Sequence, residues 1–295
     1  MVHAVHLIGF PWEEKSSLRR GSALGPWAIR RHLIRTGLIG GRLLPLPVVD
    51  EGVIRLERDD RAFEQMRHHI EDILEQQGIP IVLGGDHSIT VPVVTALARR
   101  YGPVNVIWLD RHTDLHPEFL GDRLSHACAA ARILEAGLAR SFVQIGVREL
   151  EPWEKSLAER WGVQFLRDQA ADIRWPDGPT YVSIDVDAVG WDRAGGAETG
   201  EDEWDRERLL AIVRRLRVAL VGADVVELNP RLDQGGSLAA WAAQVVLQLV
   251  LQAVRSPAAE EERAGEPAGA GREARWVSPE TRRRWRRPRG VALRA

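Results

Sequence analysis

The stretch that decides the fold is VNVIWLDRHTD, residues 104–114. Its first part, Val104–Leu109, is an apolar run of strand length, which is typical of a strand buried on both faces of a parallel sheet. In its second part, Asp110, His112 and Asp114 are spaced two residues apart, and side chains with that spacing share one face of an extended segment. The stretch therefore predicts a buried strand that ends in carboxylate and imidazole side chains pointing the same way.

Runs of the same kind recur along the chain, and helical patterns separate them. The other strand-length runs are His3–Gly9, Leu46–Val49, Ile79–Leu83, Phe142–Gly146, Thr180–Ile184 and Ala223–Leu228. The helical patterns are Pro26–Thr36, Arg61–Gln77, Ile89–Arg100, His126–Ala136, Pro152–Arg160, Arg206–Arg217 and Leu238–Arg255. Apolar strands that alternate with helices predict an α/β fold in which helices cover both faces of a parallel sheet. Ligands bind such sheets at the carboxyl ends of the strands.

Two more strand ends carry polar clusters. Residues 84–88 read GGDHS, and the two glycines allow a tight turn from which His87 projects over the edge of the sheet. Asp185 and Asp187 follow the run Thr180–Ile184 and again share a face. Four carboxylates and two imidazoles are therefore expected at adjacent strand ends.

Four crowded aspartates repel one another and require positive charge nearby. Two divalent cations would supply it, and carboxylates with some imidazole suit a harder ion such as Mn²⁺, whereas thiolates would favour zinc. Each motif alone also has a purely structural interpretation as a turn or a helix cap. Three such motifs at strand ends favour a dinuclear centre, in which ions about 3.5–4 Å apart share a water and lower its pKa.

The composition excludes several other classes of protein. The 295 residues include 40 Lys+Arg and 42 Asp+Glu, and the net charge of −2 argues against a nucleic-acid partner. Cys128 is the only cysteine, which excludes a disulfide framework and a cysteine-rich zinc module. We find no apolar run near the roughly 18 residues that span a bilayer, and the first ten residues lack a signal peptide's basic start. We expect a cytoplasmic protein with no membrane partner.

The composition changes after Val254. Residues 255–295 hold eleven Arg and six Glu but few large apolar side chains, so they cannot bury enough surface to fold. We expect one folded domain over residues 1–254 and an Arg-rich, disordered tail over residues 255–295. The cations of Arg282–Arg289 surround Trp285 and leave open a contact with a polyanion or a membrane surface.

An N-terminal signature, three polar motifs and a final block resemble, in this order, the ureohydrolase family, which includes arginase, agmatinase and formimidoylglutamase. These segments are Gly21–Arg30, Gly84–Ser88, Asp110–Asp114, Ser183–Asp187 and Asp224–Pro230, and the similarity covers about residues 5–250. The resemblance implies a three-layer α/β/α sandwich on a mostly parallel sheet of about eight strands, the arginase-like fold. Residues 1–254 would be the catalytic domain, and the chain would assemble as a homotrimer or homohexamer.

The resemblance also implies a role for each site residue. His87, Asp110, Asp114 and Asp185 would hold one Mn²⁺, and Asp110, His112, Asp185 and Asp187 would hold the second, giving two ions per subunit. Glu227 matches the family residue that pairs with the substrate guanidinium, a role that suits a carboxylate. His126, together with Asp187, would pass a proton to the leaving amine, and a near-neutral imidazole suits that transfer. Glu227 could instead be an acid at a helix start, and His126 a helix cap.

Three departures from the family pattern bear on the substrate. Arg111 replaces the usual Ala, and by the alternation it points away from the metals into the helix layer, where it needs an acidic partner or a route to solvent. Residues 190–204 keep the length of a pocket loop but lack its prolines and are more acidic. His116, a substrate-binding candidate, stands where arginases have an Asn that grips the substrate carboxylate, so arginine is disfavoured.

These features favour an agmatinase, which hydrolyses agmatine to putrescine and urea. The motif around His126 has the agmatinase form, and an acidic pocket loop suits a cationic substrate. Within the family, the alternative is a formimidoylglutamase or another guanidino-acid hydrolase, in which a protonated His116 would replace the Arg that formimidoylglutamases tend to have there. The alternative of another class is an inactive, metal-binding paralogue, which the altered loop suggests and the complete ligand set opposes.

Overall fold

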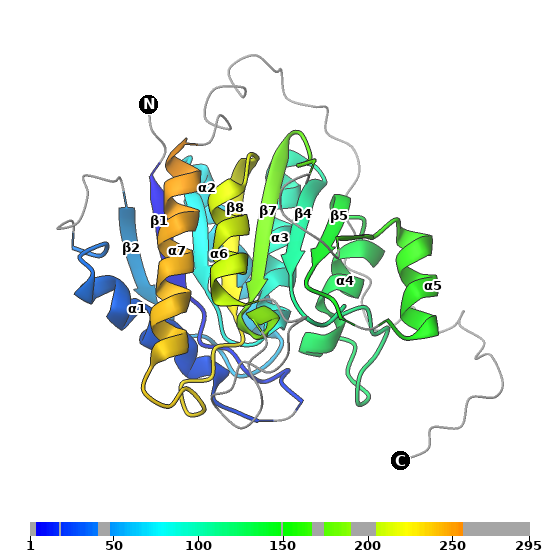
Figure 1. Ribbon diagram of the computed structural model, residues 1–295, viewed down its shortest axis with the longest axis horizontal. Helices are drawn as coiled ribbons and strands as arrows, with labels where there is room; N and C mark the ends of the chain where they lie inside the picture. Colours follow the sequence, from blue (N-terminus) through cyan, green and yellow to red (C-terminus); the bar gives the residue numbers. More distant parts are fainter. Residues whose placement is uncertain are drawn as a thin grey trace. The chain divides into compact units, whose positions relative to one another are not determined.

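The computed structural model describes residues 4–17, 19–40, 48–148, 150–166, 174–189 and 205–255. In these ranges the chain forms one eight-stranded sheet with helices on both faces, the three-layer sandwich that the sequence predicts (Figure 1). The tail that begins at Arg255 lies outside the described residues except for that first position.

The strands follow the order β2-β1-β3-β8-β7-β4-β5-β6, and all neighbouring strands are parallel. They are β1 Val5–Gly9, β2 Val48–Val53, β3 Ile79–Leu83, β4 Val104–Leu109, β5 Ala139–Ile145, β6 Gln164–Leu166, β7 Pro179–Asp185 and β8 Ala219–Val226. The apolar runs predict seven of them. They miss β6 because this edge strand has three residues and none of them is buried. β8 starts earlier than predicted, since Gly222 interrupts the apolar run but still pairs with Tyr181.

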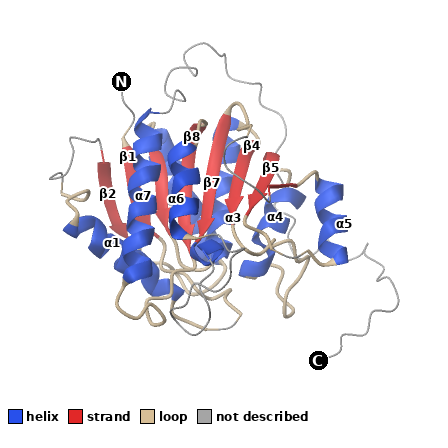
Figure 2. Ribbon diagram, viewed as in Figure 1, coloured by secondary structure: helices blue, strands red, loops and turns tan. Residues whose placement is uncertain are grey.

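The helices lie where the periodicity predicts them. They are α1 Gly25–Arg35, α2 Arg61–Glu75, α3 Thr90–Tyr101, α4 Ala129–Glu135, α5 Pro152–Trp161, α6 Arg206–Arg215 and α7 Ser237–Arg255. α1, α6 and α7 pack on one face of the sheet, and α2, α3 and α4 pack on the other (Figure 2). Each face therefore has its own apolar core, and the central strands β3, β8, β7 and β4 are buried on both sides over almost their whole length.

Helix α7 corrects one expectation. It has 19 residues, and an 18-residue stretch of it has a mean hydropathy of 1.6, so by length and composition it could span a membrane, although no run of this kind was expected from the sequence. In the structure Leu238, Trp241, Val245 and Leu249 are buried in the core that α7 forms with α1, α6 and the sheet. The apolar side chains of α7 thus pack within the fold.

The four central strands, β3, β8, β7 and β4, bring the predicted polar motifs to one edge. The connection from β3 through α3 to β4 passes over β8 and β7, so the strand order reverses here, where ligands bind in such sheets. The chain leaves β3 through Gly84 and Gly85. A Cβ atom on Gly85 would lie 1.8 Å from the main-chain oxygen of Trp12, so only glycine fits where the chain turns towards His87.

Candidate metal centre

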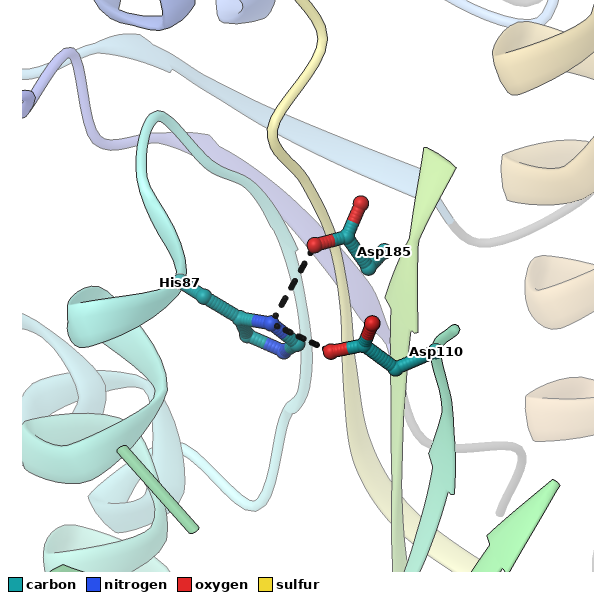
Figure 3. Close-up of side chains that lie close together, drawn as sticks. All are labelled: His87, Asp110 and Asp185. Atoms are coloured by element: carbon teal, nitrogen blue, oxygen red, sulfur yellow. Dashed lines mark ion pairs between the residues drawn. The ribbon is translucent and has the colours of Figure 1, made fainter. Parts of the chain in front are cut away.

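His87 is the centre of the first group of ligand atoms. It is the first residue of the 3₁₀ helix η2, which follows β3. Its Nδ1 lies 3.2 Å from Asp110 Oδ2, 3.2 Å from Asp114 Oδ2 and 3.4 Å from Asp185 Oδ2. Figure 3 shows the imidazole turned towards the carboxylates of Asp110, after β4, and Asp185, at the end of β7. The three strand ends therefore meet as the sequence predicts.

Asp110 also belongs to a second group, with His112 and Asp187. His112 Nδ1 lies 3.1 Å from Asp187 Oδ2 and 3.5 Å from the second carboxylate oxygen of Asp110, Oδ1. The His112 side chain is 59% exposed, so this group opens to solvent, whereas the first is buried. One carboxylate thus faces two neighbouring sites, one oxygen towards each.

The three ligands after β4 reach the site by a different geometry from the one predicted. β4 ends at Leu109, so Asp110, His112 and Asp114 do not alternate along a strand. Asp114 has a φ of 50°, a left-handed conformation that Asp tolerates better than most residues, and this turn directs it to His87. Thr113 donates instead to the buried carboxylate of Glu154.

The electrostatics of the cluster favour bound cations. Burial raises the pKa of Asp114, Asp185 and Asp187, and the charge of Asp110 raises each of them further. Burial alone would lower the pKa of His87, but the three carboxylates around it raise that pKa well above its usual value. Positive charge at Nδ1, whether a proton or a metal ion, relieves the repulsion between these carboxylates.

The donor atoms fit divalent metal ions. Within the described part of the chain, His87 Nδ1 and Asp187 Oδ1 are buried without a hydrogen-bond partner. An octahedral ion with ligands at about 2.1 Å holds neighbouring ligand atoms about 3 Å apart, close to the spacing between His87 Nδ1 and its three carboxylates. Two adjacent His/Asp groups with oxygen and nitrogen donors and no thiolate suit hard or intermediate divalent ions.

Residues that sequence reasoning did not select hold these ligands in place. Trp108 stacks on the His87 ring, with centroids 4.1 Å apart and planes 12° apart, and its Nε1 donates to Asp110 Oδ2 at 3.1 Å. Ser183 Oγ lies 2.8 Å from His87 Nε2 and donates to Asp224. Polar residues inside otherwise apolar strands, such as Ser183 and Asp224, were the signal available in the sequence.

Glu227 and His126 form a pair beside the metal groups. Glu227 follows β8 with a φ of 64°, and its Oε1 accepts from His87 N at 2.8 Å and from His126 Nδ1 at 3.1 Å. Burial alone would lower the pKa of His126, but Glu227 raises it to about 9, so the imidazole is protonated at neutral pH. His126 Nε2 then donates to Ser17 Oγ at 2.9 Å. Both candidate residues thus lie at the site, with His126 at the start of the 3₁₀ helix η3 (His126–Cys128).

His116 lies in an aromatic cluster. Its ring centroid is 4.9 Å from that of Phe119 and 4.6 Å from that of Trp153. Burial lowers the pKa of His116, the charge of Glu154 opposes this change, and the charges of His112 and His126 add to it, so the net effect favours the neutral ring. The alternative of a protonated His116 is therefore disfavoured.

Arg111 is half-buried and so has the route to solvent that its charge requires. Its positive charge acts on Asp187, where it opposes the rise in pKa that burial causes. Arg111 is therefore within electrostatic range of the second group and is not enclosed in the helix layer, contrary to the expectation from alternation. The altered pocket loop, residues 190–204, lies outside the described residues.

Similarity to known proteins extends over most of the chain. The model of the arginase family matches residues 3–252. The mitochondrial arginase 1 of Arabidopsis thaliana is 33% identical over 270 residues, 82% of this chain and 79% of the relative. The mitochondrial guanidino acid hydrolase of Homo sapiens is 30% identical over 82% of this chain and 76% of its own length. The crystal structure of a hypothetical agmatinase from Burkholderia thailandensis has a TM-score of 0.72 and 26% identity, covering 89% of this chain and 88% of that chain.

Proposed function

This chain belongs to the arginase family and is a ureohydrolase acting on linear amidines, and we propose that it binds two Mn²⁺ ions and hydrolyses agmatine. The observation that carries the proposal is the shared carboxylate of Asp110, which faces both metal groups beside the Glu227–His126 pair. One ion would be held by His87, Asp110, Asp114 and Asp185. The other would be held by Asp110, His112, Asp185 and Asp187. The metal pair, when bound, supplies a water with a pKa near neutrality as the nucleophile.

The protein's own residues bind the substrate and move its protons. The Glu227 side chain is 19% exposed, and its second oxygen, Oε2, can accept an N–H of the substrate guanidinium, because Oε1 already accepts from His87 N and His126 Nδ1. This contact would orient the central carbon of the guanidinium towards the metal groups. Asp187, whose carboxylate lies beside His112 in the second metal group, can take a proton from the attacking water. His126, protonated at neutral pH, can give its proton to the departing amine.

Agmatine is preferred over an amino acid because of His116. A substrate carboxylate needs a cation or strong donors, and His116 is neutral and packed between Phe119 and Trp153. The relatives include an arginase, a guanidino acid hydrolase and an agmatinase at similar identities, so the substrate has to be argued from such residues.

A guanidino acid is the second candidate, and Arg111 favours it. Its guanidinium is half-buried, is within electrostatic range of Asp187 and forms no ion pair with the other described residues, so it could hold a substrate carboxylate at the rim of the site.

The test is metal content together with turnover. The chain is purified with Mn²⁺, bound metal is counted per chain, and release of urea or ammonia is measured from agmatine, arginine, guanidinobutyrate and formiminoglutamate. We expect two ions per chain and the highest kcat/KM for agmatine. Preference for guanidinobutyrate would select the second candidate. Two ions without turnover of any compound would select the inactive paralogue, and no bound metal would overturn the proposal.

A further inference from the structure

Asp224 is a completely buried carboxylate that none of the steps above uses. It lies in β8, in register with Ser183 of the neighbouring β7. Ser183 Oγ donates to its Oδ1 at 2.6 Å, while Thr90 Oγ1 and Tyr181 Oη donate to its Oδ2 at 2.6 Å and 2.5 Å. No ion pair reaches it from the residues that the structure describes, so three hydroxyl groups replace a counter-charge. Burial of a carboxylate without a counter-charge is energetically unfavourable, so we expect Asp224 to have a role beyond packing at this metal site.

The hydrogen bonds of Ser183 determine which nitrogen of His87 carries hydrogen. A hydroxyl group has one proton, and that of Ser183 is directed to Asp224, the stronger acceptor. The Ser183 oxygen must then accept from His87 Nε2, 2.8 Å away. A neutral imidazole with hydrogen on Nε2 has its lone pair on Nδ1, and Nδ1 is the atom that faces the three carboxylates of the first metal group.

We propose that Asp224 and Ser183 are positioning residues that hold His87 in the tautomer whose Nδ1 is free to bind metal. The inference rests on the proposed metal centre and adds residues to it that contact neither metal nor substrate. Trp108 stacks on the same ring and fixes its plane, but a stacked ring can carry hydrogen on either nitrogen. The Asp224–Ser183 pair makes that choice, because hydrogen on Nδ1 would leave Nε2 and Ser183 without a donor between them.

The chain offers a matched control for this proposal. Ser183→Ala and Thr90→Val each remove one hydroxyl donor from Asp224, but only Ser183 contacts His87. Mn²⁺ is titrated into the full chain of each variant. Binding is monitored by calorimetry and by the electron paramagnetic resonance signal of spin-coupled ion pairs. The melting temperature of each variant measures its folding. Mutation of a residue that supports a metal ligand in this way typically lowers metal affinity by about 10–100-fold.

The expected result separates the two variants. Ser183→Ala should weaken one of the two ions by 10-fold or more and lose the spin-coupled signal at Mn²⁺ concentrations that saturate the wild type. Thr90→Val should change metal affinity less than threefold at a similar melting temperature. Ser183→Thr, which keeps the hydroxyl, should recover most of the affinity. Asp224→Asn should act like Ser183→Ala if it folds.

Other outcomes overturn the proposal. If Ser183→Ala binds both ions like the wild type, or if it and Thr90→Val lose affinity in proportion to their loss of melting temperature, the residues are structural only. These results would leave the proposed function intact. A wild-type chain that binds no Mn²⁺ in the same titration would instead count against the proposed function, and the positioning role would fall with it.

Discussion

At the scale of single residues, Asp110 is the centre of the proposed two-metal arrangement, because each of its oxygens faces a different group of candidate ligands. Asp110→Asn removes a charge that both proposed ions would share and replaces one oxygen by a donor. We expect bound Mn²⁺ to fall from two ions per chain to fewer than one, with loss of urea release. Metal analysis after gel filtration checks this. Asp177→Asn, an exposed carboxylate away from the site, is the control and should keep both ions.

His126 makes the rate depend on pH in a defined direction. Glu227 raises the pKa of His126 to about 9 against the effect of burial, so the acid form is present below this pH and is lost above it. We expect kcat/KM for agmatine to fall as pH rises through about 9, because the leaving amine then lacks its proton donor. His126→Asn should lower the rate by about 10²–10⁴-fold and remove this alkaline limb. An unchanged limb in the variant would assign it to another group.

His116 offers a test of substrate choice. A neutral ring there favours a substrate without a carboxylate, so His116→Arg should raise the preference for guanidinobutyrate over agmatine. We expect the ratio of the two kcat/KM values to shift at least tenfold, equivalent to about 1.4 kcal/mol. His116→Asn, which adds no charge, is the matched variant. An equal shift in both variants would attribute the effect to loss of the aromatic contacts with Phe119 and Trp153.

Sequence reasoning found the groups that line the metal centre but not what holds them. His87 and the aspartates at the ends of β4 and β7 stand in short motifs. The rule that the carboxyl ends of parallel strands meet at one edge of the sheet was enough to predict that they lie close together. Ser183 and Asp224 could not be paired in the same way, because they are 41 residues apart and meet only through the register of β7 and β8. The left-handed backbone of Asp114 and Glu227 was equally invisible, since it depends on the turns that follow their strands.

At the scale of elements, the start of α7 depends on a carboxylate that precedes the helix. Asp233 Oδ1 accepts from Leu238 N at 3.0 Å and its Oδ2 from Ala239 N at 2.8 Å, and the side chain is buried. Asp233→Ala should lower the free energy of unfolding by about 1–2 kcal/mol, because these N–H groups lose their acceptors. Urea denaturation measures the change. Asp233→Asn keeps one acceptor oxygen and should lose less, whereas equal losses would contradict capping.

The elements themselves were predictable where their residues are buried on both sides. β3 and β4 coincide with their apolar runs because each of their residues is buried, so composition alone marks their ends. The edge strands were harder. β2 is exposed over its middle residues, and β6 is short with no buried residue, so pairing with β1 and β5 defines them rather than local sequence.

At the scale of the whole molecule, the described site and both apolar cores lie within the unit Met1–Ala264. The last site residue in the chain is Glu227, and the core reaches Val254 in α7. Deleting residues 265–295 should therefore leave the Mn²⁺ stoichiometry and the kcat/KM for agmatine within twofold of the full chain. A larger loss would mean that the Arg-rich tail contributes to the site or to assembly.

The same deletion tests the remaining interpretation of the tail. Arg282–Arg289 cluster cations around Trp285, while the rest of the chain before residue 255 carries net negative charge. If the cluster binds a polyanion, the full chain should elute from immobilised heparin at higher salt than the truncated chain, since each phosphate- or sulfate-like contact releases counterions. Identical elution would reject that role and leave the tail as solvated chain. The proposed metal site is built from strand ends of the first unit. We therefore expect the truncated chain to keep its turnover whether or not the tail binds heparin.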